Sequence, residues 1–406
     1  MDTVPRSSMS AGTDIYSIPQ DLLDFRETIG QIARERIAPR AAEIDEKSEY
    51  PQDVRELLAE HDILALPFEE EYGGTGTGTL MLQMAVEEIA KACASSALIL
   101  MVQELGSLPI RLFGSDELKQ RVLPRCASGE WTPAFALSEP EAGSDPAAMR
   151  TNAVLDGDEW VINGTKIWTS NAHHSRWMLC LLRTDPGQKG SRGLSQIIIP
   201  MDSAGVTVRP IRSVVGEHHF NQVFLDNVRV PYENVVGKPG DAWRDTRRLL
   251  ANERFNFARL GQSKWHLTRL KGLAASEFDG QMPIIENPVF RARIAEAEIA
   301  IDALEMTTLR LLDRESQNQE AGSAPNIVKL QGAEVEQQLL ELIADIIGPY
   351  GTPFDGFARV AGGQISEAAR RSGMLVADYI EDRKFSIAGG SSEIQKNMMS
   401  RHQLEL

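Results

Sequence analysis

Two short segments near the middle of the chain combine hydroxyl groups, an indole and turn-forming residues. The first runs from Phe135 to Asp145 (FALSEPEAGSD) and ends in a Gly-Ser-Asp turn. The second runs from Ile162 to Asn171 (INGTKIWTSN) and places Trp168 and several hydroxyls just after a predicted Asn-Gly hairpin turn. An aromatic surface beside hydrogen-bond donors suits a planar heterocycle. Taken alone, the first segment is equally consistent with a surface turn, and composition alone favours a core tryptophan in the second.

Glu253 is a candidate proton acceptor because helical spacing places it among apolar side chains. Leu250 precedes it at i−3, and Leu249 and Phe257 lie at i−4 and i+4. A carboxyl group desolvated in this way has a pKa raised towards neutrality, which suits a general base. The structural alternative is a salt bridge with Arg254 or another arginine, or a solvated edge position. The pattern alone favours that alternative.

Several other patterns do not predict a site. The glycines of 74–78 lack the preceding strand and the spacing of a dinucleotide fingerprint, and Gly164-Thr165-Lys166 lacks the first glycine of a P-loop. The pairs His173-His174 and His218-His219 are adjacent in sequence, so in a strand their side chains point to opposite faces. We therefore predict no metal site.

Three regions of the chain, which differ in the spacing of their apolar residues, must position these residues. Helical spacing of apolar residues recurs near 22–37, 52–62, 79–105 and 115–127, and again near 242–275, 288–316, 325–347 and 366–383. Between them, short apolar runs separated by turn dipeptides predict antiparallel strands, with Asp156-Gly157 as a further hairpin turn. We predict an α+β chain with an N-terminal helical domain (1–130), a middle antiparallel β-barrel or sandwich domain (131–240) and a C-terminal helical bundle (241–406).

Composition narrows the possible partners and compartments. The 406 residues carry 42 Lys and Arg against 58 Asp and Glu, a formal charge of −16. Such a balance repels phosphate backbones and anionic lipids, so we predict neither nucleic acid nor a membrane surface as a partner. The cysteines at 93, 126 and 180 form no CxxC pattern, and the longest apolar stretch is too short to span a bilayer. We expect a cytoplasmic location, with an organellar matrix as the lesser alternative.

Together, the two central segments closely resemble the acyl-CoA dehydrogenase family, whose members use FAD. Further resemblances follow in the same order along the chain, from about Asp21 to Arg401. They are a proline, acidic, Tyr-Gly-Gly loop (Pro67 to Gly76), a strand after the β domain (Val223 to Pro231) and the start of a terminal helix (Ile387 to Asn397).

The resemblance implies roles for individual residues. In this family the flavin lies against the β domain and meets the acyl thioester in a cleft lined by C-terminal helices. Phe135, Leu137, Ser138, Trp168 and Ser170 would line the flavin, Gly143 and Ser144 would approach the cofactor and the CoA, and Ser391 and Glu393 would complete the cofactor pocket.

The same resemblance bears on the catalytic base. Most members carry a carboxylate directly before the Gly-Thr or Gly-Ser of the terminal segment, where this chain has Gly389. A minority, including isovaleryl-CoA dehydrogenase and long-chain enzymes, carry it on an earlier helix directly before an arginine, where this chain has Glu253-Arg254. We therefore expect Glu253 as the base, with Ser144, Arg254 and Gly389 beside the substrate.

The implied activity is the oxidation of an acyl-CoA to the trans-2-enoyl-CoA, with electrons passed to electron-transferring flavoprotein. An oxidase that uses oxygen and a non-catalytic partner subunit remain alternatives. A homotetramer is expected, but 277–281 reads Glu-Phe-Asp-Gly-Gln where many relatives have Arg-x-x-Phe-Gly, and Asp345 replaces a frequent glutamine. These departures leave a dimer or a hetero-oligomer open. The acyl length and branching, and a carrier-protein thioester in place of CoA, also stay open.

Overall fold

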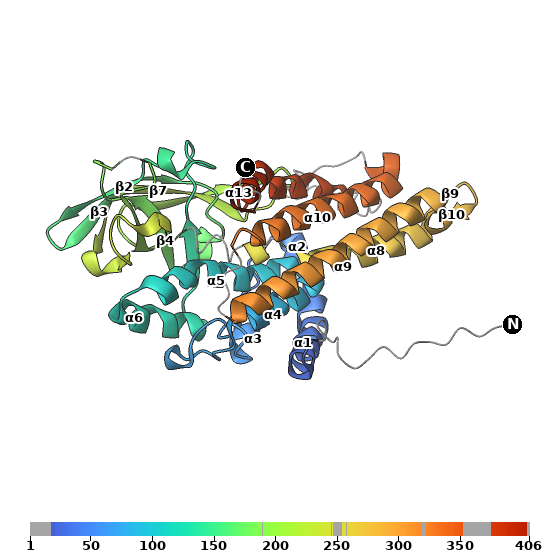
Figure 1. The fold of residues 1–406 in the computed structure, drawn as a ribbon, viewed down its shortest axis with the longest axis horizontal. Helices are drawn as coiled ribbons and strands as arrows, with labels where there is room; N and C mark the ends of the chain where they lie inside the picture. The colour runs from blue at the N-terminus through green and yellow to red at the C-terminus, as the bar shows by residue number, and fades with distance from the viewer. Residues whose placement is uncertain are drawn as a thin grey trace.

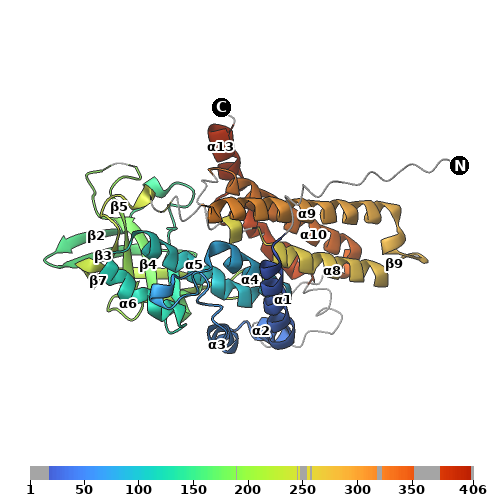
Figure 2. The same cartoon turned by 60° about the horizontal axis from the view of Figure 1, so that its bottom comes forward.

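The computed structural model describes residues 18–188, 190–244, 246, 254–256, 258–317, 322–351 and 375–403. A β domain lies at one end of the elongated molecule and a bundle of long helices at the other (Figure 1). The N-terminal helices lie between these two parts in both ribbon views (Figures 1 and 2). The predicted α+β fold, with a β domain between two helical regions, is confirmed.

The N-terminal region is helical in each stretch where the apolar spacing predicts it. Its helices are α1 (Gln20–Ile32), continued by a π-helical turn (Ala33–Ile37) into α2 (Ala38–Lys47), then α3 (Gln52–Glu60), α4 (Gly78–Ala92), α5 (Ala94–Phe113) and α6 (Asp116–Ala127). The Ser115 side chain caps α6 by accepting a hydrogen bond from the backbone N–H of Leu118 (3.2 Å). By length and composition α5 could cross a membrane, but 67% of its most apolar window is buried within the protein.

In the described part of the chain, the β domain is built on one eight-stranded sheet. The strands are β1 (Pro133–Ala136), β2 (Asn152–Asp156), β3 (Glu159–Lys166), β4 (Trp177–Arg183), β5 (Leu194–Pro200), β6 (Val206–Ile211), β7 (Phe220–Pro231) and β8 (Val235–Val236). Their order is β6-β7-β3-β2-β4-β5-β8, and β1 pairs with β4. Most pairs are antiparallel as predicted, but β1 runs parallel to β4 and β2 meets β4 in parallel at one position.

The two dipeptides predicted as hairpin turns have different outcomes. Gly157 has a φ of +68° in the turn between β2 and β3, so the prediction of a hairpin turn at Asp156-Gly157 is confirmed. The prediction for Asn163-Gly164 is wrong, because both residues lie inside β3 at a register shift against β7. Gly164 has a φ of +150°, and a Cβ there would lie 2.4 Å from Thr151 Oγ1. Close approach of the neighbouring chain therefore requires glycine at this bulge.

Strands β4 and β5 are buried on both faces, which explains their continuous apolar sequences. On one face, Met178 and Ile199 belong to the core of the β domain. On the other, Trp177 and Ile198 belong to a core shared with residues of α5 and α6. The three cysteines are free and buried in three different cores: Cys93 in that of the N-terminal helices, Cys126 under the sheet and Cys180 inside the β domain.

The C-terminal region forms the helical bundle, with one addition. Its elements are α8 (Leu260–Ser276), a two-stranded hairpin of β9 (Phe278–Asp279) and β10 (Met282–Pro283), α9 (Pro288–Ser316), α10 (Pro325–Ile347) and α13 (Ser392–Gln403). The hairpin occupies the segment that lacks the family's arginine. Asp345 pairs with Arg293 (2.7 Å). Of the helix predicted at 366–383, residues 366–374 lie outside the described residues.

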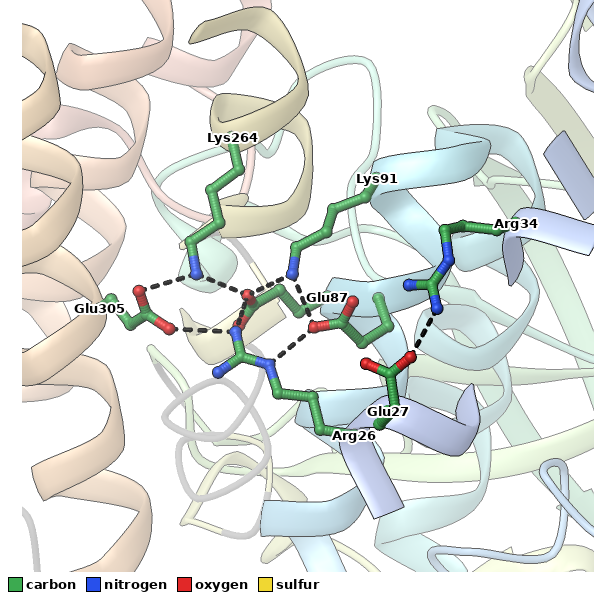
Figure 3. Close-up of polar contacts among 8 residues, drawn as sticks. Arg26, Glu27, Arg34, Glu87, Lys91, Lys264 and Glu305 are labelled. Carbon is green, nitrogen blue, oxygen red and sulfur yellow. Dashed lines mark hydrogen bonds and ion pairs between the residues drawn. The ribbon is translucent and has the colours of Figure 1, made fainter. Parts of the chain in front are cut away.

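An ion-pair network joins the N-terminal and C-terminal helices (Figure 3). Arg26 of α1 pairs with Glu87 and Glu88 of α4 and with Glu305 of α9 (3.0 Å). Lys264 of α8 pairs with both Glu87 and Glu305, each at 2.7 Å. Burial opposes the charge of Arg26, but the neighbouring carboxylates raise its pKa. The four helices are therefore tied to one another by partly buried charges.

Candidate active site

The two central segments meet beside the end of β3. The backbone N–H of Ile167 donates to the carbonyl oxygen of Ser138 (3.0 Å), and Lys166 Nζ donates to the carbonyl oxygen of Leu137 (3.1 Å). Phe135 lies on β1, two residues before Leu137. These contacts bring the segment of Phe135, Leu137 and Ser138 to the segment that carries Trp168 and Ser170, and the contact of these residues with a flavin stays a prediction.

A buried ion pair holds this junction together. Lys166 is 0% exposed, and its Nζ lies 2.8 Å from Oε1 of Glu139. The Glu139 carboxylate also accepts hydrogen bonds from the backbone N–H groups of Arg150 (2.7 Å) and Thr151 (3.0 Å). Burial opposes its charge, but attraction to the Lys166 ammonium and these N–H groups lower the pKa of Glu139. The sequence did not single out this pair.

Trp168 has an unusual backbone and an unusual exposure. Its φ is +61°, a region that a bulky side chain adopts only at a cost in free energy, and 55% of the residue is exposed. The next residue, Thr169, is held in place because its N–H donates to the carbonyl of Asn221 (3.0 Å) and its own carbonyl accepts from Asn221 Nδ2 (3.1 Å). Phe220 meets the indole edge-on at 5.8 Å between ring centroids.

Gly143 and Ser144 lie on an exposed turn next to this junction. Ala142 exchanges backbone hydrogen bonds with Glu139 (3.0 and 3.1 Å), and the two predicted residues follow directly. Both are exposed. Their roles towards cofactor and CoA remain predictions.

The terminal segment forms a tight loop before α13. Gly389 and Gly390 have φ values of +68° and +89°, and Gln395 Nε2 donates to both carbonyl oxygens (3.1 Å each). Ser391 Oγ accepts from the N–H of Ile394 (3.4 Å) at the start of the helix. Hydrogen bonds from its own N–H and from the Ser391 hydroxyl lower the pKa of Glu393. Ser391 and Glu393 therefore lie at the N-terminus of α13, and their contact with the cofactor stays a prediction.

Two contacts connect this terminal segment with the rest of the site. Lys384 Nζ lies 5.4 Å from the ring centroid of Phe220 and 5.3 Å from that of Phe385, so the segment approaches the strand beside Trp168. Arg254 is buried, and its Nη2 lies 3.5 Å from the sulfur of Met398 on α13. Figure 1 shows α13 between the β domain and α10. Glu253, the predicted base, lies outside the described residues.

The described residues fit a bound flavin. Trp168 presents an exposed indole in a strained conformation. Thr169 Oγ1 and Gln395 Oε1 are buried polar atoms that have no hydrogen-bond partner in the described part of the chain. A buried polar atom without a hydrogen bond lowers the stability of the protein unless a ligand supplies the missing hydrogen bond. A planar cofactor with polar ring atoms supplies both an aromatic contact and hydrogen bonds.

Sequence reasoning missed Phe220, Asn221 and Lys384. Phe220 and Asn221 directly precede the recognisable strand at 223–231, and Lys384 lies three residues before the terminal segment at 387–397. Their positions beside known segments were the available signal. Only the folded chain shows that these segments meet.

Comparison with known proteins identifies the family. Profiles described as the N-terminal, middle and C-terminal domains of acyl-CoA dehydrogenase match residues 19–130, 134–228 and 240–404. The chain belongs to the acyl-CoA dehydrogenase family. It is an FAD-dependent oxidoreductase of that family, and FAD supplies the hydride acceptor when bound.

Relatives and solved structures cover most of the chain. Acyl-CoA dehydrogenase IpdE1 of Mycobacterium tuberculosis is 35% identical over 349 residues, 86% of each chain. Cyclohexane-1-carbonyl-CoA dehydrogenase of Geobacter metallireducens is 33% identical, covering 83% of this chain and 90% of that protein. The structure of glutaryl-coenzyme A dehydrogenase with glutaryl-CoA has a TM-score of 0.85 at 25% identity and covers 96% of both chains. Butyryl-CoA dehydrogenase of Megasphaera elsdenii shares the fold, with a TM-score of 0.82 at 22% identity over 94% of this chain and 98% of that one.

Proposed function

We propose that this enzyme introduces an α,β double bond into an acyl-CoA thioester and yields the trans-2-enoyl-CoA. The observation that carries the proposal is the exposed Trp168 beside Phe220, together with the approach of the terminal segment through Lys384. This arrangement leaves an aromatic face for a flavin between the β domain and the C-terminal helices. Phe135, Leu137, Ser138, Ser170, Ser391 and Glu393 are proposed to line the same flavin.

Glu253 is the proposed base for the α-proton. Its neighbour Arg254 is buried against α13, the helix that begins at the terminal loop. Two residues further on, Asn256 Oδ1 accepts a buried hydrogen bond from Gln83 Nε2 (2.7 Å), which ties this segment to α4. Gly389 offers no carboxylate at the position used by most of the family. These contacts support a segment held at the site, with Glu253 directly before it.

The proposed substrate is a branched or cyclic acyl-CoA. The base position resembles that of isovaleryl-CoA dehydrogenase, and one relative at 33% identity is named for cyclohexane-1-carbonyl-CoA. Ser144 and Arg254 are proposed to contact the substrate. When the base lies on an earlier helix, position 389 of the terminal loop can be glycine in place of a residue with a carboxylate side chain. More room then remains there for a bulky acyl group.

Electron-transferring flavoprotein is the proposed electron acceptor, and a homotetramer the proposed assembly. Exposed apolar residues on the outer side of α9, Val289 (64%), Ile299 (67%) and Met306 (37%), support burial in an assembly. The hairpin at 278–283 replaces the family's arginine, so a second kind of subunit is the alternative outcome. The cytoplasmic location stays a prediction.

The deciding experiment is anaerobic mixing of the purified, FAD-loaded protein with branched, cyclic and straight-chain acyl-CoAs while the flavin absorbance is followed. We expect branched or cyclic substrates to bleach the flavin. Glu253→Gln should keep FAD and substrate binding but slow bleaching by about 100-fold, the usual scale for loss of a general base. Glu60→Gln, a change to an exposed acid at the end of α3, is the matched control and should bleach normally.

Other results would overturn parts of the proposal. If no acyl-CoA bleaches the bound flavin, the chain would be a non-catalytic partner subunit. An isolated chain that is colourless, because it retains no FAD, would support the same conclusion. Rapid reoxidation by oxygen without electron-transferring flavoprotein would indicate an oxidase. Near-normal bleaching by Glu253→Gln would remove Glu253 as the base.

A further inference from the structure

A buried cluster of charged residues lies between α8, α10 and the chain that leads into the terminal loop. At its centre is Glu336 of α10, which is 0% exposed. Glu336 accepts hydrogen bonds from Ser263 Oγ (2.5 Å), lies 2.6 Å from His266 Nδ1 and pairs with Arg259 Nη2 (3.4 Å). Arg259 also pairs with Asp382 (2.8 Å). One carboxylate therefore connects α8 with the residues around 382.

The charges of this cluster balance one another. Asp378 lies 3.8 Å from His266 Nε2 and pairs with Arg269 (3.2 Å). Burial opposes the charge of His266, but attraction to Glu336 and hydrogen bonds to Asp378 and Glu336 raise its pKa to about 9. Burial likewise opposes the charge of Glu336, yet His266 and Arg259 lower its pKa. The cluster thus contains three acidic and three basic side chains: Glu336, Asp378, Asp382, Arg259, His266 and Arg269.

The cluster contacts the chain before the terminal loop and follows the 254–256 segment closely in sequence. Arg259 has a φ of +51° and occupies the N-cap position of α8, five residues after Arg254. Its guanidinium lies 3.7 Å from the ring centroid of Phe385. The carbonyl of Phe385 accepts a hydrogen bond from the buried Lys329 of α10 (2.9 Å). Phe385 lies four residues before Gly389, so Arg259 stands between the segment of the proposed base and the terminal loop.

We propose that Glu336 is a positioning residue, which acts through Arg259 to hold the 254–256 segment and the 387–391 loop in a fixed relation. This inference rests on the proposed function. In the described part of the chain, these contacts of Glu336 reach no predicted substrate or flavin residue directly. Its effect on the reaction therefore comes through geometry, and a displacement of about 1 Å can slow an enzyme by about 100-fold.

The test is Glu336→Gln in the FAD-loaded protein. The amide keeps the size of the side chain but removes the charge that Arg259 and His266 face. We expect FAD to remain bound, the flavin-reduction rate at saturating acyl-CoA to fall at least about tenfold, and KM to change by less than about threefold. Amide hydrogen exchange in 387–391 should become faster, which is a readout independent of activity.

Glu87→Gln is the matched control because Glu87 lies in the other interhelical ion-pair network (Figure 3). It also loses a largely buried carboxylate, which faces three cations, Arg26, Lys91 and Lys264, and among the described residues none of these ion pairs reaches the terminal loop. It should lower the melting temperature as Glu336→Gln does, with normal flavin reduction and normal exchange in 387–391. If Glu336→Gln reduces its flavin within about twofold of the unchanged protein, or if Glu87→Gln slows reduction equally, the inference is wrong.

A second pair of variants keeps the test decisive if Glu336→Gln does not fold. Arg259→Gln should slow flavin reduction and Arg259→Lys should restore part of the rate, because lysine keeps the charge near Glu336. Equal rates in both would overturn the inference. An unchanged protein that no acyl-CoA reduces would instead refute the proposed function, and the exchange measurement would still decide the positioning role.

Discussion

Replacing Lys166 by methionine tests the buried ion pair that joins the two segments proposed to line the flavin. The substitution keeps an unbranched apolar side chain but removes the hydrogen bonds to Glu139 (2.8 Å) and to the Leu137 carbonyl (3.1 Å). Both bonds are charge-assisted because the donor is the lysine ammonium, and each contributes about 1.5 to 2 kcal/mol. The Glu139 carboxylate keeps its two backbone donors, so it is not wholly uncompensated. We expect a cost of about 3 kcal/mol, at the low end for a broken buried pair.

The assay has two parts. Urea unfolding followed by circular dichroism gives the change in stability, and flavin fluorescence on dilution gives the dissociation constant of FAD. A tenfold loss of FAD affinity corresponds to about 1.4 kcal/mol, which is less than half of the stability cost expected for Lys166→Met. Loosening of the 137–139 segment should therefore weaken FAD binding at least about tenfold. Lys238→Met removes a lysine that is 82% exposed and 3.7 Å from Asp241, and it should change neither quantity measurably.

The double variant Lys166→Met/Glu139→Gln sharpens the test. Removing the carboxylate together with its counter-charge should recover part of the stability lost in Lys166→Met. A single substitution that costs less than about 1 kcal/mol and leaves FAD affinity unchanged would refute the supporting role of the pair.

Three further predictions concern the flavin, the base and pH. Trp168→Ala should weaken FAD binding by about 1 to 3 kcal/mol through lost aromatic contact, measured by flavin titration. Glu253→Gly combined with Gly389→Glu should recover measurable anaerobic bleaching relative to Glu253→Gly alone, with a changed preference among acyl-CoAs. The free energy of unfolding should fall as pH rises from neutrality through 9. The pKa of His266 is raised from 6.5 to about 9, so its stabilisation is full below 6.5 and is lost above 9, a difference of about 3 kcal/mol.

Each of these predictions has its own control and contrary result. Trp265→Ala removes a similarly exposed indole (41%) on α8, and equal FAD loss there would show a non-specific effect. For the relocated carboxylate, bleaching no faster than in Glu253→Gly would leave the decision to Glu253→Gln alone, since misplacement by about 1 Å can abolish turnover. For His266, denaturant titrations of His266→Gln between neutrality and pH 9 should show a flatter profile, and an unchanged slope would contradict the assignment.

The sequence predicted those parts of the fold that depend on local patterns. Helical spacing predicted α9 and α10 because a 3.6-residue period can be recognised from residues that are close in sequence. The turn at Gly157 was predicted for the same reason. Asn163-Gly164 was interpreted wrongly as a turn because β7 extends the pairing of β3 beyond it, and tertiary pairing overrides a local preference there.

The site was predictable only as separate segments. Glu139 and Lys166 are 27 residues apart, and no local spacing indicates that they form a buried pair. The approach of Lys384 to Phe220 likewise depends on how the C-terminal helices pack against the β domain. The resemblance supplied the residues proposed to line the flavin, whereas the contacts that hold their segments together come from long-range packing.

Because the three cysteines lie in different cores, the reactivity of each thiol can report the local unfolding of its own core. Burial raises the pKa of Cys126 to about 12 and that of Cys180 to about 11, so neither thiol reacts while its surroundings stay closed. Because each cysteine lies in a different core, alkylation followed by peptide mapping would give a separate opening rate for the N-terminal helices, the helix–sheet contact and the β interior. No engineered label would be needed to order these openings in time.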